Sequence, residues 1–473
     1  MEEDVEYKAL IHALEHKLNV EKSFDLQLRP VVTPFGEASV FTAAGLCSGE
    51  LAHRVIEYLL RCPDGEYCLK NLPCHDVSYS DDVGTLAEAV LSGRAVVAVE
   101  GSGKAAMLDI KSYPLRSVDE PENDRVLRGP RDGFGEALVR NSSLIRRRLR
   151  DPRLIMERFT LGSGGTLDVA LCYVDGCADG KFVEKMRKKL SSLNVKALNM
   201  TQESLCEALI HRGWYNPFPK VRYTERPDAA AAMLEEGSVL ILCDNSPQAM
   251  ILPTSIFDFL QETDDYYLPP VIGSYLRLTR MGIFFLSLFL TPLWYYCVKN
   301  VSALPSALHF LDIDEPAAVP LLLQLFLAEF MIDGLKLASL NTPNMLNNSL
   351  SVVGGLILGD YAVEAGWFSP QTILYMAIVA IAAFTQQSYE LGYAFKFFRL
   401  LMLLLTELFG LWGLVLGLVL TLAVLSLNRT VEGGRSYLYP LVPFNGKAML
   451  RTVFRVRLKP DEKGGGCGGG KGA

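Results

Sequence analysis

The sequence predicts an α/β N-terminal region of two subdomains, expected in the cytoplasm, followed by an all-α polytopic membrane domain. Residues 1–270 carry 31 Lys and Arg against 41 Asp and Glu, whereas residues 271–473 carry 15 against 12. Short apolar segments alternate with helix-like segments in the first part, which is typical of layered α/β proteins. Long apolar runs dominate the second part. The expected domains are a helical segment (1–34), two α/β subdomains (35–165 and 166–270), a transmembrane domain (271–430) and a basic cytoplasmic tail with a glycine-rich end (431–473).

The N-terminal region contains two helix–hairpin units of similar spacing. We expect the following elements: amphipathic helices over 5–20 and 50–61, a strand at Leu167–Val174, a helix at Lys181–Leu193, and hairpins at Ala95–Ile110 and Val239–Leu252. Segment Ala87–Ile110 aligns without a gap on Ala230–Pro253, at an offset of 143. We interpret this as two related subdomains with a cleft for a small ligand between them. The alternative is that any two helix–hairpin units share such apolar spacing.

Motifs for catalysis, cofactors or nucleic acid are weak. Gly101–Lys104 resembles part of a phosphate-binding loop, but Ala98 and Ala105 stand where that loop needs a glycine and a hydroxyl. Reduced, partly buried thiols are a better interpretation than a metal site for one group of residues: Cys62, Cys68, Cys74 and His75. We therefore predict no enzyme activity, no cofactor and no metal. The chain also lacks the basic face of a protein that binds nucleic acid.

Four arginines end a helix that we expect to begin at Gly135: Arg146, Arg147, Arg148 and Arg150. Cations at a helix C-terminus offset the partial negative charge of the last carbonyl groups, which is the simpler interpretation. The alternative is a docking patch for an acidic neighbour or for lipid headgroups. Because the rest of this region is acidic, we predict that the patch supports assembly of a homo-oligomer.

The C-terminal part contains apolar runs flanked by basic residues. Met281–Val298 follows Arg277 and Arg280 and ends near the aromatic stretch Trp294–Tyr296, which is typical of a helix that enters the bilayer from the cytoplasm. Further apolar runs lie at Val319–Leu335, Leu350–Ala365, Thr372–Phe384 and Phe395–Leu427, the last being one long helix or two short ones. The acidic start of the chain and its basic tail both favour the cytoplasm. The number of crossings must then be even, and we predict four, plus embedded or interfacial segments.

Five carboxylates lie within or at the ends of these apolar runs: Glu329, Asp333, Asp360, Glu364 and Glu407. A lone carboxylate at membrane depth costs roughly 2.5–3.5 kcal/mol on insertion scales, so it should face protein or water. The simpler interpretation places a carboxylate near the membrane surface, and it fits Asp333, Glu364 and Glu407. Five acids nevertheless exceed what an anchor needs, and they indicate a water-filled path.

The segment Ser349–Asp360 is the predicted pore lining. It combines small residues, bulky residues that suit an apolar gate, and an acid that would favour cations when repeated around a ring: Ser349, Val352, Val353, Gly355, Ile357 and Asp360. The polar, helix-breaking stretch Asn341–Asn344 precedes it. The alternative is ordinary helix packing, with Asp360 at the membrane surface.

Six stretches of the sequence are specific: Leu127–Phe134, Asn141–Pro152, Pro217–Pro227, Thr342–Pro343, Ser351–Gly355 and Ser388–Gly392. Through them the sequence resembles the A subunits of the GerA spore germination family over about residues 35–460. Thr291–Tyr295 and Tyr439–Gly446 indicate one subtype within the family. Gln386 and Gln387 stand where members often have proline, so the resemblance does not define the local bend there.

The resemblance implies a multi-pass protein of the spore inner membrane that acts in spore germination with partner transmembrane germination proteins. It also implies homo-oligomers that form a ligand-responsive channel for monovalent cations. The indicated subtype implies an accessory channel that amplifies ion release and does not itself sense nutrients. Two rivals remain: a secondary transporter, for which the sequence shows no inverted repeat, and a membrane scaffold that only recruits partners.

Overall fold

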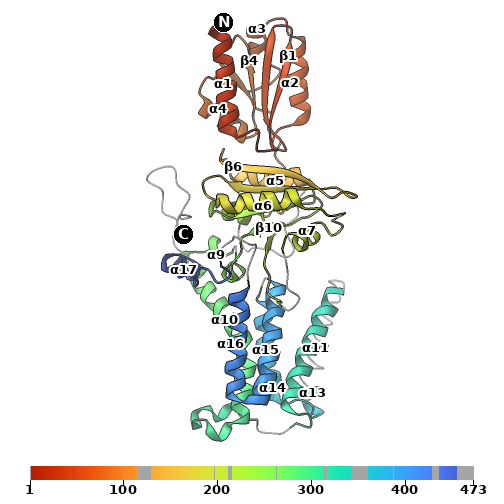
Figure 1. Cartoon of the computed structure of the whole chain (residues 1–473), viewed down its shortest axis with the longest axis vertical. Coiled ribbons are helices and arrows are strands. Elements are labelled where there is room, and N and C mark those ends of the chain that lie inside the picture. The colour runs from red at the N-terminus through yellow and green to blue at the C-terminus, as the bar shows by residue number, and fades with distance from the viewer. Residues whose placement is uncertain are drawn as a thin grey trace.

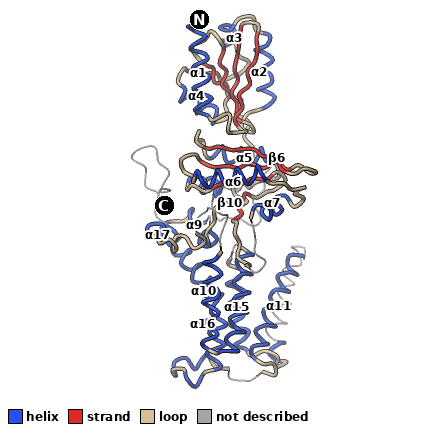
Figure 2. The backbone as a smooth tube through the Cα atoms, in the orientation of Figure 1, coloured by secondary structure: helices blue, strands red, loops and turns tan. Residues whose placement is uncertain are grey.

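The computed structural model describes residues 2–114, 129–196, 198–210, 216–262, 264–313, 317–341, 361–386, 388–428 and 436–454. Two α/β units are stacked on a set of helices that run along the long axis of the molecule (Figure 1). Strands occur in the two upper units, whereas the lower part is drawn as helices and loops (Figure 2). The described residues therefore have the predicted fold class, with two α/β subdomains and then an all-α part.

The first unit is a five-stranded antiparallel sheet in the order β1-β2-β4-β5-β3. Its strands are β1 (Leu26–Thr33), β2 (Gly36–Ala43), β3 (Val77–Ser80), β4 (Ala95–Val99) and β5 (Ala105–Leu108). Its helices are α1 (Glu2–Leu18), α2 (Gly49–Arg61), α3 (Gly65–Lys70) and α4 (Val83–Leu91). Helices α1 and α4 pack on one face of the sheet, and α2 and α3 on the other. Because both faces are covered, every residue of β4 is buried and the strand reads as a continuous apolar run.

The second unit repeats this architecture in the order β6-β7-β9-β10-β8. Its strands are β6 (Leu154–Leu161), β7 (Leu167–Val174), β8 (Arg222–Thr224), β9 (Val239–Cys243) and β10 (Ala249–Leu252). Its helices are α5 (Leu138–Arg148), α6 (Gly180–Ser192), α7 (Thr201–Leu209) and α8 (Pro227–Glu235). Helices α6 and α7 cover one face, and α5 and α8 cover the other.

The two sheets confirm the repeat that the sequence predicts. Strands β4 and β5 hold the same places in the first sheet as β9 and β10 hold in the second, and α4 precedes them as α8 does. The expected boundaries after residues 34 and 165 differ from the observed ones. Both fall in hairpin turns, because β1 pairs with β2 along its whole length and β6 pairs with β7 in the same way. Strand β1 therefore belongs to the first sheet, and strand β6 belongs to the second.

The described residues of the C-terminal part form helices joined by loops, without a strand. Its elements are η1 (Ile256–Leu260), α9 (Asp264–Tyr267), α10 (Pro270–Lys299), η2 (Val301–Ala303), η3 (Ser306–Leu311), α11 (Leu321–Asn341), α13 (Ala362–Glu364), α14 (Pro370–Phe384), α15 (Tyr389–Phe409), α16 (Leu411–Leu427) and α17 (Gly446–Val453). Among the described helices, α10 is long and apolar enough to cross a membrane, and α14 and α16 are shorter apolar helices.

The apolar run Phe395–Leu427 forms two packed helices rather than one. The chain reverses between α15 and α16 at Gly410, whose φ of +59° suits a residue without a side chain. Close packing depends on another glycine of α16. A Cβ atom on Gly417 would lie 2.5 Å from Cγ of Met402 on α15.

Helix α16 turns most of its large apolar side chains outward and mainly small or polar residues inward. Gly417 and Thr421 are buried, whereas Trp412 is 77% exposed; Leu408 at the end of α15 is likewise 72% exposed. The arrangement in α16 is the reverse of that in a water-soluble helix, where the apolar face packs inward. An exposed apolar surface of this kind marks a site of contact with membrane or protein.

Candidate functional site

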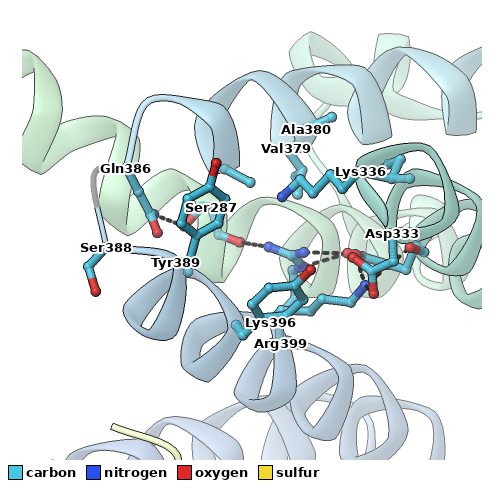
Figure 3. Close-up of a pocket in the computed structure, with 15 residues that line it drawn as sticks. Ser287, Asp333, Lys336, Val379, Ala380, Gln386, Ser388, Tyr389, Lys396 and Arg399 are labelled. Carbon is cyan, nitrogen blue, oxygen red and sulfur yellow. Dashed lines mark hydrogen bonds and ion pairs between the residues drawn. The ribbon is translucent and has the colours of Figure 1, made fainter. Parts of the chain in front are cut away.

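The site is a cluster of charged side chains between α11 and α15, which we call the charge cluster: Glu329, Asp333, Lys336, Lys396 and Arg399 (Figure 3). On α11, Glu329 and Asp333 are four residues apart, and on α15, Lys396 and Arg399 are three apart. Such spacings place each pair on one face of its helix. The acidic face of α11 thus meets the basic face of α15.

Arg399 is the centre of the charge cluster. Its Nε donates a hydrogen bond to Oε1 of Glu329 at 2.8 Å, and its Nη2 donates to the same oxygen. Its Nη1 donates to the backbone carbonyl of Ser287 on α10. The side chains of Arg399 and Glu329 are 4% and 5% exposed, respectively. One buried guanidinium therefore joins three helices that are distant in the sequence.

Lys396 binds both carboxylates of α11. Its Nζ lies 3.3 Å from Oε2 of Glu329, donates to the backbone carbonyl of Glu329 at 3.1 Å and pairs with Oδ2 of Asp333. Lys336 places its Nζ 5.0 Å from the ring centroid of Phe384, a cation–π contact. The five residues of the cluster comprise three cations and two carboxylates, so the cluster has a net charge of +1.

The cluster surrounds a cavity of about 30 Å³, enough space for one or two water molecules. Pairing explains how the charges can lie among apolar helices. An unpaired buried ion costs several kcal/mol, and removal of one partner of a buried pair costs about 3–5 kcal/mol. The cluster therefore links α11 to α15 through paired charges, and removal of one partner would leave another charge buried without its pair.

Comparison with known proteins agrees with the resemblance seen in the sequence. The profile of the Bacillus/Clostridium GerA spore germination protein family matches residues 13–463. The chain belongs to the GerA family. Stage V sporulation protein AF of Bacillus subtilis (strain 168) is 35% identical over 461 residues, which cover 95% of this chain and 92% of that protein. This relative has the subtype that Thr291–Tyr295 and Tyr439–Gly446 indicate.

Two further matches are similar to parts of this GerA chain. Spore germination protein KA of Bacillus subtilis (strain 168) is 29% identical over 398 residues, which cover 83% of this chain and 72% of that protein. The crystal structure of the N-terminal domain of the A subunit of the Bacillus megaterium spore germinant receptor GerK3 is 22% identical. The match covers 51% of this chain and 92% of that domain, with a TM-score of 0.38.

The structure places the predicted intramembrane acids of this GerA chain in different surroundings. Glu329 and Asp333 belong to the charge cluster, whereas Glu364 is exposed on α13. Glu407 accepts hydrogen bonds from Tyr295 and Lys299 at the C-terminal end of α10. The predicted pore segment lies outside the described residues, and with it Ser349, Val352, Val353, Gly355, Ile357 and Asp360. That segment stays a prediction.

The arginine patch differs from the prediction at Arg146, which is fully buried within the chain. Its Nε donates to Oδ2 of Asp25 at 2.7 Å and its Nη2 to Oδ1 at 3.2 Å, so the pair joins α5 to the segment before β1. Arg146 is thus inaccessible to another subunit, because it connects the two sheets. Arg148 donates to Asp132 at 2.5 Å, Arg147 lies 4.7 Å from the ring centroid of Tyr113, and Arg150 is exposed. A role of Arg147, Arg148 and Arg150 in assembly stays a prediction.

The arginines that precede the apolar run of α10 have buried acidic partners. Asp265 is fully buried and accepts from Nε of Arg277 at 3.1 Å and from Nη1 of Arg280 at 3.0 Å. Arg280 also pairs with Glu262. From the sequence, Arg277 and Arg280 were predicted only as charges that flank an apolar run, and their pairing with buried acids was not predicted. Together they anchor the start of α10 to the segment that follows the second sheet.

The basic residues of the charge cluster were not predicted from the sequence. Lys396 and Arg399 lie in or beside an apolar run, with a spacing that matches the acids of α11. Two cations on one face of an apolar run are a signal that they need acidic partners, although the sequence does not show which helix supplies them.

The cysteines near His75 lie in the first unit, far from the charge cluster in the sequence. Cys62 and Cys68 are buried in the core of the first unit, and burial raises the pKa of Cys68 to about 12.

Proposed function

We propose that this GerA chain forms a homo-oligomeric channel that conducts monovalent cations during spore germination, together with partner transmembrane germination proteins. The observation that carries this proposal is the charge cluster, which places five charged side chains among apolar helices, with Glu329 and Arg399 almost completely buried and the other three half-buried. A helix that only anchors a protein needs no buried charge, and intramembrane charges mark ion paths or polar interfaces. The role in spore germination follows from membership of the GerA family.

We further propose that α10, α11, α14, α15 and α16 lie in the spore inner membrane and that both α/β units are cytoplasmic. The outward apolar side chains of α15 and α16 support this arrangement, because lipid can cover them at no cost. Helices α14 and α16 have 15 and 17 residues, short of the about 20 that cross a bilayer without tilt or thinning. Arg277 and Arg280 at the start of α10 favour a cytoplasmic location for the preceding units.

The charge cluster acts in this proposal as a latch on the closed state. Helix α11 ends at Asn341, directly before the stretch that leads to the predicted pore segment. The pairs of Glu329 with Lys396 and Arg399 fix α11 against α15, and so fix where that stretch begins. A latch worth a few kcal/mol is of the size needed to keep the open state in the minority, yet let a bound partner reverse the equilibrium.

A secondary transporter is the second candidate, and the charge cluster favours it in one respect. Transporters also place ion-paired side chains in polar sites between helices and use them to bind a coupling ion. The two functions differ in kinetics. A channel gives stepwise conductance, whereas a transporter gives a saturable flux with fixed stoichiometry.

The test is ion flux from the purified full-length chain in liposomes and in planar bilayers. Stepwise cation conductance supports the channel, and saturable, stoichiometric flux supports the transporter. A folded, membrane-inserted chain without any flux, alone or with partner proteins, would overturn both candidates and leave a scaffold. The variant Arg399→Met, in which the cluster is disrupted, indicates whether any flux passes under control of this site.

A further inference from the structure

A second and larger cavity lies between the second α/β unit and the junction of α14 with α15. Its volume is about 540 Å³, in the range of sites that hold small molecules. We call it the junction cavity. The second unit contributes β8 and Gln248, directly before β10, and the helical part contributes the last turn of α14 and the first turn of α15. Gln386, Ser388 and Tyr389 line both the junction cavity and the cavity of the charge cluster (Figure 3).

The junction cavity is strongly acidic. Four carboxylates and one guanidinium line it: Glu203, Glu225, Glu262, Glu390 and Arg222. The carboxylates come from four separate elements or loops, namely α7, the loop after β8, the loop after η1 and the first turn of α15. Two of these carboxylates already have partners within the chain. Glu262 forms an ion pair with Arg280, and Glu225 accepts a hydrogen bond from Gln248. The excess of negative charge in a concave site concentrates cations and repels anions.

Three buried polar atoms of residues that line the cavity lack a hydrogen-bond partner among the described residues. They are Oε1 of Gln386, Nη1 of Arg222 and the hydroxyl oxygen of Tyr223. Nε2 of Gln386 donates a 3.4 Å hydrogen bond to the hydroxyl of Ser287, so Oε1 of Gln386 is left to accept another hydrogen bond. A buried polar atom without a partner is costly, so such atoms indicate that the site is filled by a polar ligand or by ordered water. The acceptor on Gln386 suits an ammonium group, and the donor on Arg222 suits water held beside it.

We propose that the junction cavity binds a linear organic cation with two or more ammonium groups, a diamine or polyamine. The carboxylates belong to separate elements, so an extended ligand can reach several of them, whereas a single inorganic ion cannot. Aromatic side chains in the wall, those of Phe259, Phe384 and Tyr389, suit the methylene segments and provide cation–π contacts. The size of the cavity fits such a chain and leaves a bare monovalent cation without sufficient contacts.

The position of this site gives it a regulatory consequence, which rests on the proposed function. A ligand that spans Glu225 and Glu390 connects the second sheet to the N-terminus of α15. Gln386 in the same wall contacts Ser287, and the backbone carbonyl of Ser287 accepts from Arg399 of the charge cluster. Binding would therefore bias the position of α15, and with it the latch. The binding itself does not depend on whether the chain conducts ions.

The experiment is calorimetric titration and thermal unfolding of the full-length chain in detergent at constant ionic strength. The probes are 1,5-diaminopentane and spermidine, with pentylamine, potassium chloride and glutarate as comparisons. We expect both multivalent amines to bind and to raise the unfolding temperature, because they bind the folded state. The double variant Glu225→Gln/Glu390→Gln should lower their affinity at least tenfold. The control is Glu88→Gln, an exposed acid of the first unit, and it should bind as the native chain does.

Three outcomes would overturn the proposal. The first is no heat and no shift with either multivalent amine. The second is equal affinity of the native chain and the double variant. The third is equal binding of pentylamine or potassium, which would show general accumulation of cations. The single variant Glu390→Gln, on an exposed residue of α15, keeps the test decisive if loss of the Glu225–Gln248 contact impairs folding.

Discussion

Nε of Arg399 on α15 donates a 2.8 Å hydrogen bond to Oε1 of Glu329 on α11, and both side chains are almost completely buried. The two residues are 70 positions apart, so their contact is set by the packing of the helices and not by local sequence. The contact links α11 to α15 through charge, in addition to the apolar cluster that Leu325 and Ala328 of α11 share with Leu403 of α15. The proposals about gating depend on this relationship.

Breaking the pair from one side should be more costly than replacing both partners. We expect Glu329→Ala, which leaves Arg399 without its carboxylate, to destabilise the chain by about 3–5 kcal/mol. The double variant Glu329→Leu/Arg399→Met should cost less than the sum of its single changes, because no charge is left unpaired. Thermal unfolding of the four proteins in detergent measures the coupling. Additive losses would show that the two side chains act independently.

Close packing of α15 against α16 should tolerate no side chain at Gly417. We expect Gly417→Leu to destabilise the helical part by about 1–3 kcal/mol, because Met402 occupies the space next to its Cα. The matched control is Gly282→Leu on α10, where nothing lies within 4 Å of the added Cβ. Unfolding curves of the two variants provide the comparison. Equal stability would indicate that the helices separate easily at Gly417.

The buried pair of Arg146 with Asp25 should stabilise the stacking of the two sheets. We expect Arg146→Ala to cost about 3–5 kcal/mol, since Asp25 would remain buried without a partner. Changing the exposed Arg150 of the same patch to Ala should lower the free energy of unfolding by less than about 0.5 kcal/mol. Urea unfolding measures both effects. If Arg146→Ala leaves stability intact and instead dissociates oligomers, the patch acts between subunits.

Protonation of Glu157 should make the stability of the second unit depend on pH in the acid range. Burial raises the pKa of Glu157, but hydrogen bonds from Arg187 and Tyr173 outweigh it and hold that pKa below its usual 4.5. A lowered folded-state pKa stabilises the fold above pH 4.5, and this contribution disappears as the pH falls through the folded-state value. The gap in melting temperature between the native chain and Arg187→Met should therefore narrow below pH 4.5. The control Lys181→Met, an exposed cation of α6, should show a constant gap, and a constant gap for both variants would refute the assignment.

The sequence predicted the central strands and helices well, because their patterns are local. Strand β7 coincides with the predicted Leu167–Val174, an apolar run whose residues are nearly all buried. The edge strands were harder to predict from the sequence. Strand β1 contains Pro30 and several exposed residues, and β8 has only three residues, so neither shows a clear pattern. Their place in the sheets depends on pairing with a partner strand.

Half of the charge cluster was predictable and half was not. An acid in an apolar run is conspicuous in a sequence, so Glu329 and Asp333 were recognised. Their partners lie 63 to 70 positions away, and helical periodicity shows which face they occupy but not which helix they meet. Only the packing of α11 against α15 brings the two faces together. The same limit applies to Asp25 and Arg146, which are 121 positions apart.

Single-channel recording of Glu329→Gln beside the native chain in planar bilayers tests the central claim most directly. The change keeps the size of the side chain but removes the charge that holds Arg399, so the latch should weaken. The account predicts stepwise cation conductance in both proteins, with a clearly higher open probability in the variant. A folded variant that inserts in the bilayer and yet shows the same open probability, or no conductance from either protein, would contradict it.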